Sequence, residues 1–107
     1  MVNASSETPS PSLTAVRGPI EHAVKSWPQL FEAALTGAKT HDLRRAGDRD
    51  YRVGDTLLLQ EFDPDTQRYS GRELRVRITY ITSASAPCAL SESSLDPDDC
   101  ILSIRRI

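Results

Sequence analysis

The segment from Glu73 to Thr82 constrains the fold most strongly, because its polar and apolar residues alternate from Glu73 to Tyr80. Apolar or aromatic residues stand at positions 74, 76, 78 and 80, and polar residues stand at positions 75, 77 and 79. A period of two places successive side chains on opposite faces of a β-strand. The segment therefore predicts a strand with one face in the core and the other in solvent.

Other segments predict further strands. We expect them over Ile20–Lys25, Thr40–Arg45, Thr56–Phe62 and Cys100–Ile107. Three consecutive leucines at positions 57–59 suggest that the third of these is buried on both faces. Turn and loop residues fill positions 63–71 and 83–99.

Residues 26–37 carry the start and stop signals of one helix. Ser26-Trp27-Pro28-Gln29 matches a capping box with proline in the first turn, and Gly37 stands where a left-handed C-terminal cap is expected. Apolar residues recur between these signals at helical spacing, which predicts a face buried in the core. These residues are Trp27, Leu30, Phe31, Ala34 and Leu35.

The element order favours an α+β fold that is mainly β, since strands and helices do not alternate regularly. We expect a small, partly closed β-barrel of about five strands with one packed N-terminal helix. Residues 1–18 are rich in Ser, Thr and Pro and predict a disordered tail, which leaves residues 19–107 as the domain.

Composition narrows the class of protein. The 107 residues carry a net charge of -2, so a global basic field that attracts nucleic acid is excluded. The sequence has no apolar run that could cross a bilayer and no signal peptide, so we expect a cytoplasmic protein with no membrane partner, and a monomer. Cys88 and Cys100 lack metal-ligand spacing, which predicts free thiols, no metal and no cofactor.

Residues 37–55 concentrate charge around a short apolar spine and form the candidate site. They contain five Lys or Arg residues and four Asp residues. In a strand over Thr40–Arg45, the side chains of Thr40, Asp42 and Arg44 share one face, with Lys39 at its mouth. Such a row of hydroxyl, carboxylate and guanidinium groups can hold an anionic or hydrogen-bonding ligand.

The motifs in this region resemble a known family. Gly37-x-Lys39-Thr40-x-Asp42-x-Arg44, followed by Asp48-Arg49-x-Tyr51-x-x-Gly54-Asp55, is similar to the domain of unknown function 3850, a branch of the ASCH superfamily. The resemblance covers roughly residues 21–107 and implies a PUA-like β-barrel. It also implies an RNA or nucleoside ligand in a cleft lined by a Gly-x-Lys-x-x-Glu-x-Arg motif, in which Asp42 replaces the usual Glu.

The favoured function is therefore an RNA- or nucleoside-binding module. Tyr51 is preferred to Trp27 for stacking on a base, because Trp27 lies on the apolar helical stripe. The predicted ligand-binding residues are Lys39, Thr40, Asp42, Arg44, Asp48, Arg49, Tyr51 and Glu61.

The alternative is a small hydrolase of RNA or of a modified nucleoside, with Lys39, Asp42 and His22 as the catalytic residues. Some ASCH proteins hydrolyse RNA or remove acyl groups from modified cytidine. In the acylcytidine hydrolases a threonine takes the place of Asp42, so their specific mechanism is not expected here. Binding is favoured, because the residues supply no complete set of nucleophile, base and orienting group.

Several of these candidates also have a structural interpretation, which the sequence leaves open. Asp42 and Arg44 can form an ion pair, and Lys39 can be a solvated cation after a helix end. His22 can be a satisfied hydrogen-bonding residue, and Glu61 can pair with an arginine.

Overall fold

The computed structural model describes residues 17–86 and 95–107. Most of the predicted tail, residues 1–16, and the loop segment 87–94 with Cys88 lie outside the described residues. The described elements, in chain order, are β2 (Glu21–Ser26), α2 (Pro28–Leu35), β3 (His41–Arg45), β4 (Thr56–Asp63), β5 (Arg68–Ser83) and β6 (Asp99–Arg106). The one helix described, α2, is too short to span a membrane.

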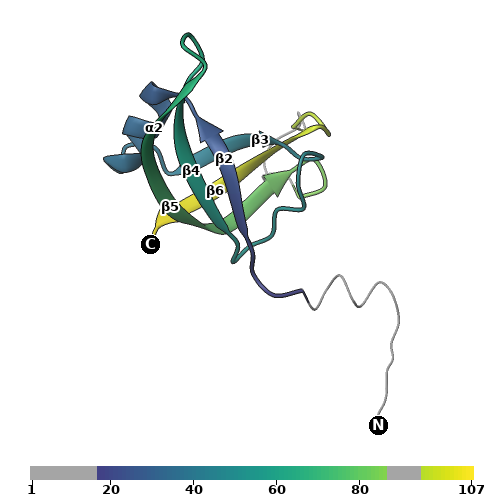
Figure 1. The fold of residues 1–107 in the computed structure, drawn as a ribbon. Helices are drawn as coiled ribbons and strands as arrows, with labels where there is room; N and C mark the ends of the chain where they lie inside the picture. Colours follow the sequence, from purple (N-terminus) through teal and green to yellow (C-terminus); the bar gives the residue numbers. More distant parts are fainter. Residues whose placement is uncertain (1–16, 87–94) are drawn as a thin grey trace.

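The five strands form one sheet in the order β2-β4-β5-β6-β3. The β2 and β4 strands are parallel, and the other neighbouring pairs are antiparallel. The sheet curls into a half-barrel, with α2 at one end (Figure 1). The prediction of a mainly β, α+β fold with about five strands and one packed helix is confirmed.

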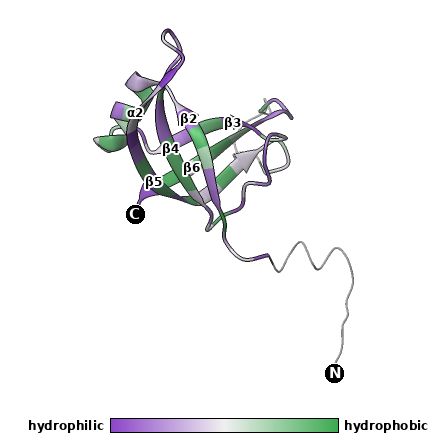
Figure 2. Ribbon diagram, viewed as in Figure 1, coloured by the Kyte–Doolittle hydropathy of each residue, from purple (hydrophilic) through white to green (hydrophobic). Residues whose placement is uncertain are grey.

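The alternating segment forms the centre of β5, the longest strand. Leu74, Val76 and Ile78 are buried, and the arginines between them are exposed. Figure 2 shows this alternation of hydrophobic and hydrophilic residues along the strands. β5 begins at Arg68, earlier than predicted, because Gly71 adopts a φ of +94° where the register with β4 shifts, so the strand continues through the expected loop.

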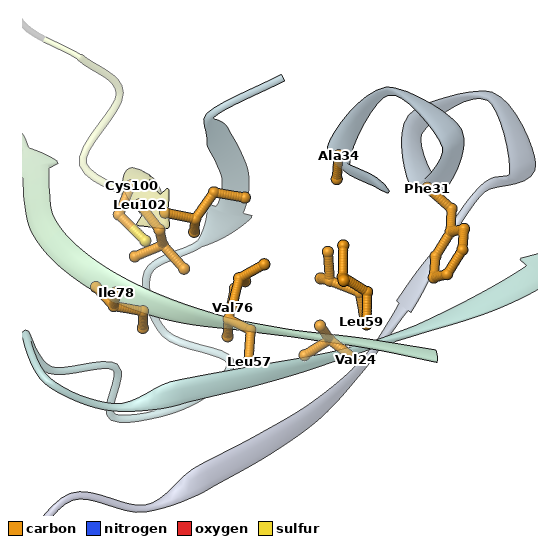
Figure 3. Packing of buried hydrophobic residues seen from close by; sticks show 11 residues of the cluster. Val24, Phe31, Ala34, Leu57, Leu59, Val76, Ile78, Cys100 and Leu102 are labelled. Atoms are coloured by element: carbon orange, nitrogen blue, oxygen red, sulfur yellow. The ribbon is translucent and has the colours of Figure 1, made fainter. Parts of the chain in front are cut away.

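The core lies between the concave face of the sheet and α2. Leu57 and Leu59 of β4 lie opposite Val76 and Leu74 of β5, and all four are buried. Leu58 is also buried but lies outside the main core cluster, so the prediction that this strand is covered on both faces is confirmed. Figure 3 shows how the helix and the strands share this core. Its buried members include Val24, Phe31, Ala34, Leu57, Leu59, Val76, Ile78, Cys100 and Leu102.

The start of the helix differs from the prediction. Ser26 is the last residue of β2, and Trp27 is the N-cap, with extended backbone angles and no capping side chain. The capping box is therefore wrong, because the parallel ladder that pairs Ser26 with Glu61 keeps Ser26 in the strand. Gly37 has a φ of +83° just after the helix, and its N–H donates to the Ala34 carbonyl, as a left-handed cap requires.

The apolar stripe of the helix is only partly buried. Phe31 and Ala34 face the core, but Trp27 and Leu30 are 46 % and 44 % exposed. The prediction that Trp27 belongs to the core is wrong. Trp27 precedes the first helical residue, so the direction of its side chain does not follow the helical repeat.

Candidate functional site

The candidate site lies where the half-barrel is open. β2 and β3 are the two edge strands of the sheet, and Arg44 of β3 reaches across to β2. One terminal nitrogen of its guanidinium donates a 2.9 Å hydrogen bond to the backbone carbonyl of Lys25. An edge strand presents backbone groups without ladder partners, and Arg44 occupies one of them. We call this opening the seam.

Behind the seam, three motif residues form two linked ion pairs, with Asp42 between Lys39 and Arg44. Asp42 is 7 % exposed, and its Oδ2 accepts from Nε of Arg44 at 2.8 Å. Its Oδ1 accepts from Nζ of Lys39 at 3.1 Å, and Lys39 also donates to the carbonyl of His41. Both carboxylate oxygens are therefore occupied, and Asp42 orients the two cations on either side of it.

Two cavities that share Lys25 and Arg44 form the seam groove. One, of about 360 Å³, is lined by Lys25, Ser26, Trp27, Leu30, Asp42, Leu43 and Arg44. The other, of about 250 Å³, is lined by Ala23, Val24, Lys25, Arg44, Asp48, Arg49, Tyr51, Gln60 and Tyr69. The groove thus joins β2, β3 and the loop that follows β3.

An aromatic cluster borders the groove. The Trp27 ring lies 6.1 Å from the ring of buried Phe62, and Phe62 meets Tyr69 edge-on at 4.9 Å. Nζ of Lys25 lies 4.3 Å from the centroid of the Phe62 ring. Trp27 lines one cavity and Tyr69, 53 % exposed, lines the other, so each half of the groove has an exposed aromatic ring.

Tyr51 is the aromatic residue that the sequence favoured for stacking on a base. It lines the groove, and its ring also packs against a residue inside the domain. Its ring lies 4.9 Å from the ring of His22. Burial raises the pKa of the Tyr51 hydroxyl, so the ring stays neutral. The exposure of the two rings is the reverse of the expectation, since Trp27 is the more open one.

His22, a predicted catalytic residue, belongs to a separate buried network. Its Nε2 lies 2.8 Å from Oδ2 of Asp55, which is only 1 % exposed. The two oxygens of Asp55 also accept from both terminal nitrogens of Arg17 and from the backbone N–H groups of Ile20 and Arg52. Arg17, assigned by the sequence to the tail, is therefore held against the domain.

The electrostatics of Asp55 follow from these contacts. Burial alone would raise the pKa of this carboxyl group, but the hydrogen bonds from Arg17 and His22 outweigh burial and hold the pKa well below its usual range. Asp55 is therefore an ionised structural anchor that joins residues far apart in the chain. His22 already has an acidic partner in this anchor, which matches its structural interpretation.

Glu61 lies away from the groove, in a second structural network. Its carboxylate accepts from Ser70 Oγ at 2.6 Å and from Arg72 Nε at 3.0 Å. These hydrogen bonds, first from Arg72 and then from Ser70, lower the pKa of Glu61. Arg72 also binds Glu32 of α2, so the network ties the β4–β5 hairpin to the helix and does not face the groove.

Thr40 is also separated from the predicted row. β3 begins at His41, and Thr40 lines a different cavity together with Ser103 and Arg105. Its carbonyl accepts from the N–H of Ile104 at 3.0 Å. The structure therefore brings together Lys39, Asp42 and Arg44, and places Asp48, Arg49 and Tyr51 beside Arg44, while Thr40, His22 and Glu61 lie elsewhere.

Lys25, Trp27 and Tyr69 are groove residues that the sequence analysis did not select. A usable signal existed for Trp27, since Pro28 marks the first helical position and leaves Trp27 outside the repeat. No group of three or more His, Cys, Asp or Glu side chains within residues 17–86 and 95–107 is arranged to hold a metal ion.

Comparison with known proteins agrees with the motifs. A family model described as "Domain of unknown function (DUF3850)" matches residues 21–104. The chain is also similar to the "Uncharacterized 12.9 kDa protein in GpA 3'region" of Escherichia phage P2, with 38 % identity over 64 residues. This alignment covers 60 % of the chain and 56 % of the phage protein, so the chain spans little more than half the length of that relative.

Proposed function

The chain belongs to the DUF3850 family, and from the geometry of its seam groove we propose that it binds single-stranded RNA or a nucleoside. One observation carries the proposal. Two exposed aromatic rings, Trp27 and Tyr69, border a groove whose cations include Arg44. Exposed rings beside cations are the combination with which proteins grip unpaired bases and their phosphates.

The aromatic rings supply the base-binding part of the proposal. Every base has a flat π-face, so stacking on Trp27 or Tyr69 needs no particular sequence. Leu30 and Leu43 add apolar walls on the Trp27 side of the groove. A base inserted there covers surface that is otherwise open to water, since Leu43 is 58 % exposed.

The cations supply the phosphate-binding part. Within the described part of the chain, Lys25 and Arg49 make no ion pair, so neither charge is neutralised there by a carboxylate. The ammonium of Lys25 lies over the Phe62 ring. Lys39 and Arg44 together neutralise Asp42, which leaves the groove locally positive although the whole chain has a net charge of -2. The ASCH resemblance supports the same ligand class, with Asp42 holding Arg44 in place.

The alternative, hydrolysis of RNA or of a modified nucleoside, has less support. Asp42 and His22, its candidate proton carriers, already hold charged or hydrogen-bonding partners. A general base needs a free position within hydrogen-bond reach of the reacting proton.

Trp27 is the only tryptophan, so its fluorescence reports directly on the groove. We expect a single-stranded RNA of about ten nucleotides to quench this fluorescence in a saturable way. Labelled RNA then measures the affinity of variants by anisotropy. Trp27→Ala should weaken binding about 5- to 150-fold, for the 1–3 kcal/mol that one stacked base contributes.

Arg44→Ala should weaken binding and lower the salt dependence, by about 0.7 in slope for each lost phosphate contact on a single strand. Arg68→Ala is the matched control, because Arg68 is exposed on β5 and lines neither cavity of the groove. The proposal is wrong if a panel of RNAs and nucleosides neither quenches Trp27 nor changes anisotropy. Chromatography of the same mixtures tests hydrolysis, which new products would support.

A further inference from the structure

A third cavity, of about 500 Å³, lies beside the C-terminal end of β6 and has a lining without any carboxylate. Its polar residues are Lys39, Thr40, Thr79, Ser103, Arg105 and Arg106. It is larger than either cavity of the seam groove. We call it the β6 cavity. A cavity with three cations and three hydroxyl groups favours an anionic occupant.

Among the described residues, two of the three cations already bind a group of the protein, and the third does not. Lys39 binds Asp42, and one terminal nitrogen of Arg106 donates to the carbonyl of Leu35 at 2.9 Å. Arg106 thereby satisfies a carbonyl at the end of α2. Arg105 makes no hydrogen bond or ion pair through its side chain within residues 17–86 and 95–107. Its guanidinium is the group available to a ligand.

Arg105 also stands directly opposite another arginine. In the antiparallel ladder between β5 and β6, Arg77 pairs with Arg105, and both residues are exposed. Like charges at directly opposed positions destabilise a sheet. In the described residues no carboxylate pairs with either guanidinium. Arg77 does not line the β6 cavity, but an anion bound there to Arg105 offsets this repulsion.

Hydroxyl groups complete the set of donors. Thr79 Oγ1 is engaged with the carbonyl of Ser103 at 3.3 Å, whereas the hydroxyls of Thr40 and Ser103 make no such bond in the described part of the chain. Guanidinium and hydroxyl groups together are the side chains that most often contact phosphate oxygens. The β6 cavity therefore has the chemistry of a phosphate site.

The β6 cavity and the seam groove border the same helix. Leu30 lines the groove and Ala34 lines the β6 cavity, so the two sites lie about one helical turn apart along α2, roughly 6 Å of rise. Lys39 and Asp42, which bind each other, line the β6 cavity and the groove respectively. A strand whose base occupies the groove can thus reach Arg105 within a few nucleotides.

We propose that Arg105, with the hydroxyls of Ser103 and Thr40, binds a backbone phosphate of the strand whose base occupies the seam groove. This proposal rests on the proposed function. It assigns the groove to the base and the β6 cavity to the phosphate chain, so a nucleoside, which has no phosphate, should use only the groove.

Two measurements separate this proposal from the proposed function. In the first, inorganic phosphate is titrated into the whole ¹⁵N-labelled protein. We expect the amide signals of Thr40 and of residues 103–106 to shift, and the shifts to be lost in Arg105→Ala but kept in Arg68→Ala. Because Arg105→Ala also removes the like-charge pair, its melting temperature should stay equal or rise.

In the second measurement, Arg105→Ala should weaken binding of a single-stranded RNA of about ten nucleotides several-fold and lower its salt slope by about 0.7. Its affinity for a nucleoside should not change. Arg77→Ala should have a smaller effect, because Arg77 does not line the cavity. Arg105→Lys should restore part of the loss, since the charge returns without the planar fork.

The outcomes are distinct. If RNA binds but Arg105→Ala keeps the wild-type affinity and slope, the β6 assignment is overturned and the groove stands. If phosphate shifts the β6 signals while no RNA or nucleoside binds, the anion site stands alone and the proposed function is overturned. If neither probe has an effect, both are overturned. A loss of nucleoside binding in Arg105→Ala also overturns the assignment, because Arg105 would then act on the groove.

Discussion

Replacing Asp55 by asparagine should test whether the buried carboxylate anchors the base of the half-barrel. Asn has nearly the same shape, so packing is kept while the charge and one acceptor are lost. Oδ1 of Asp55 accepts from Arg17 and from the N–H of Ile20, and Oδ2 accepts from Arg17, His22 and the N–H of Arg52. In either orientation, the asparagine amide group faces at least two of these donors.

The expected loss of stability follows from this count. Leaving a buried donor without a partner costs about 1–3 kcal/mol. Two such losses give a decrease of about 2–6 kcal/mol in the free energy of unfolding, to which the uncompensated arginine adds. A small domain has about 5–15 kcal/mol in total, so Asp55→Asn should lower the urea midpoint markedly.

Asp50→Asn is the matched control. Asp50 pairs with Arg17 and Arg52, but its side chain is 64 % exposed. An exposed ion pair of this kind contributes about 0–1 kcal/mol. A loss below about 1 kcal/mol in Asp55→Asn, or equal losses in the two variants, would refute the role of a buried anchor.

The pH dependence gives a second check on Asp55. Its pKa is lower in the folded protein than in the unfolded chain, so the carboxylate stabilises the fold at neutral pH. This stabilisation is lost as the pH falls below the ordinary Asp pKa near 4 towards the lower folded value. The deficit of Asp55→Asn relative to wild type should therefore shrink below about pH 4. A constant deficit would show that the charge has no part in it.

Two further changes test the packing and the N-terminal boundary. Phe31→Ala should lower the free energy of unfolding in urea by about 3–5 kcal/mol, because Phe31 is 1 % exposed in the core. Trp27→Ala should lower it by less than about 1 kcal/mol. The opposite order would place Trp27 in the core after all. Arg17→Ala should lower the free energy of unfolding by about 1–3 kcal/mol, because it removes two donors to Asp55. Removal of residues 1–18 should lower it as much. An unchanged melting temperature after either change would show that the Arg17 contact does not stabilise the fold.

Local patterns predicted the elements of this protein well. Alternation over Glu73–Thr82 identified the centre of β5, because the period of two is a property of the strand itself. Gly37 ended the helix as expected, because a positive φ is favourable for glycine whatever surrounds it. The Lys39–Asp42–Arg44 cluster was also within reach, since these residues lie within six positions of one another.

The tertiary structure alone decided which elements meet. The order β2-β4-β5-β6-β3 brings Arg44 to the Lys25 carbonyl across the seam, 19 residues away, and joins Asp55 to Arg17 across 38 residues. An alternating pattern is the same for every strand order, so it fixes which face of a strand is buried and leaves its neighbours open. The separation of Thr40 from the groove and the separation of Glu61 from it depend on those neighbours. They follow from the curl of the sheet, which sets which side chains from distant strands share one surface.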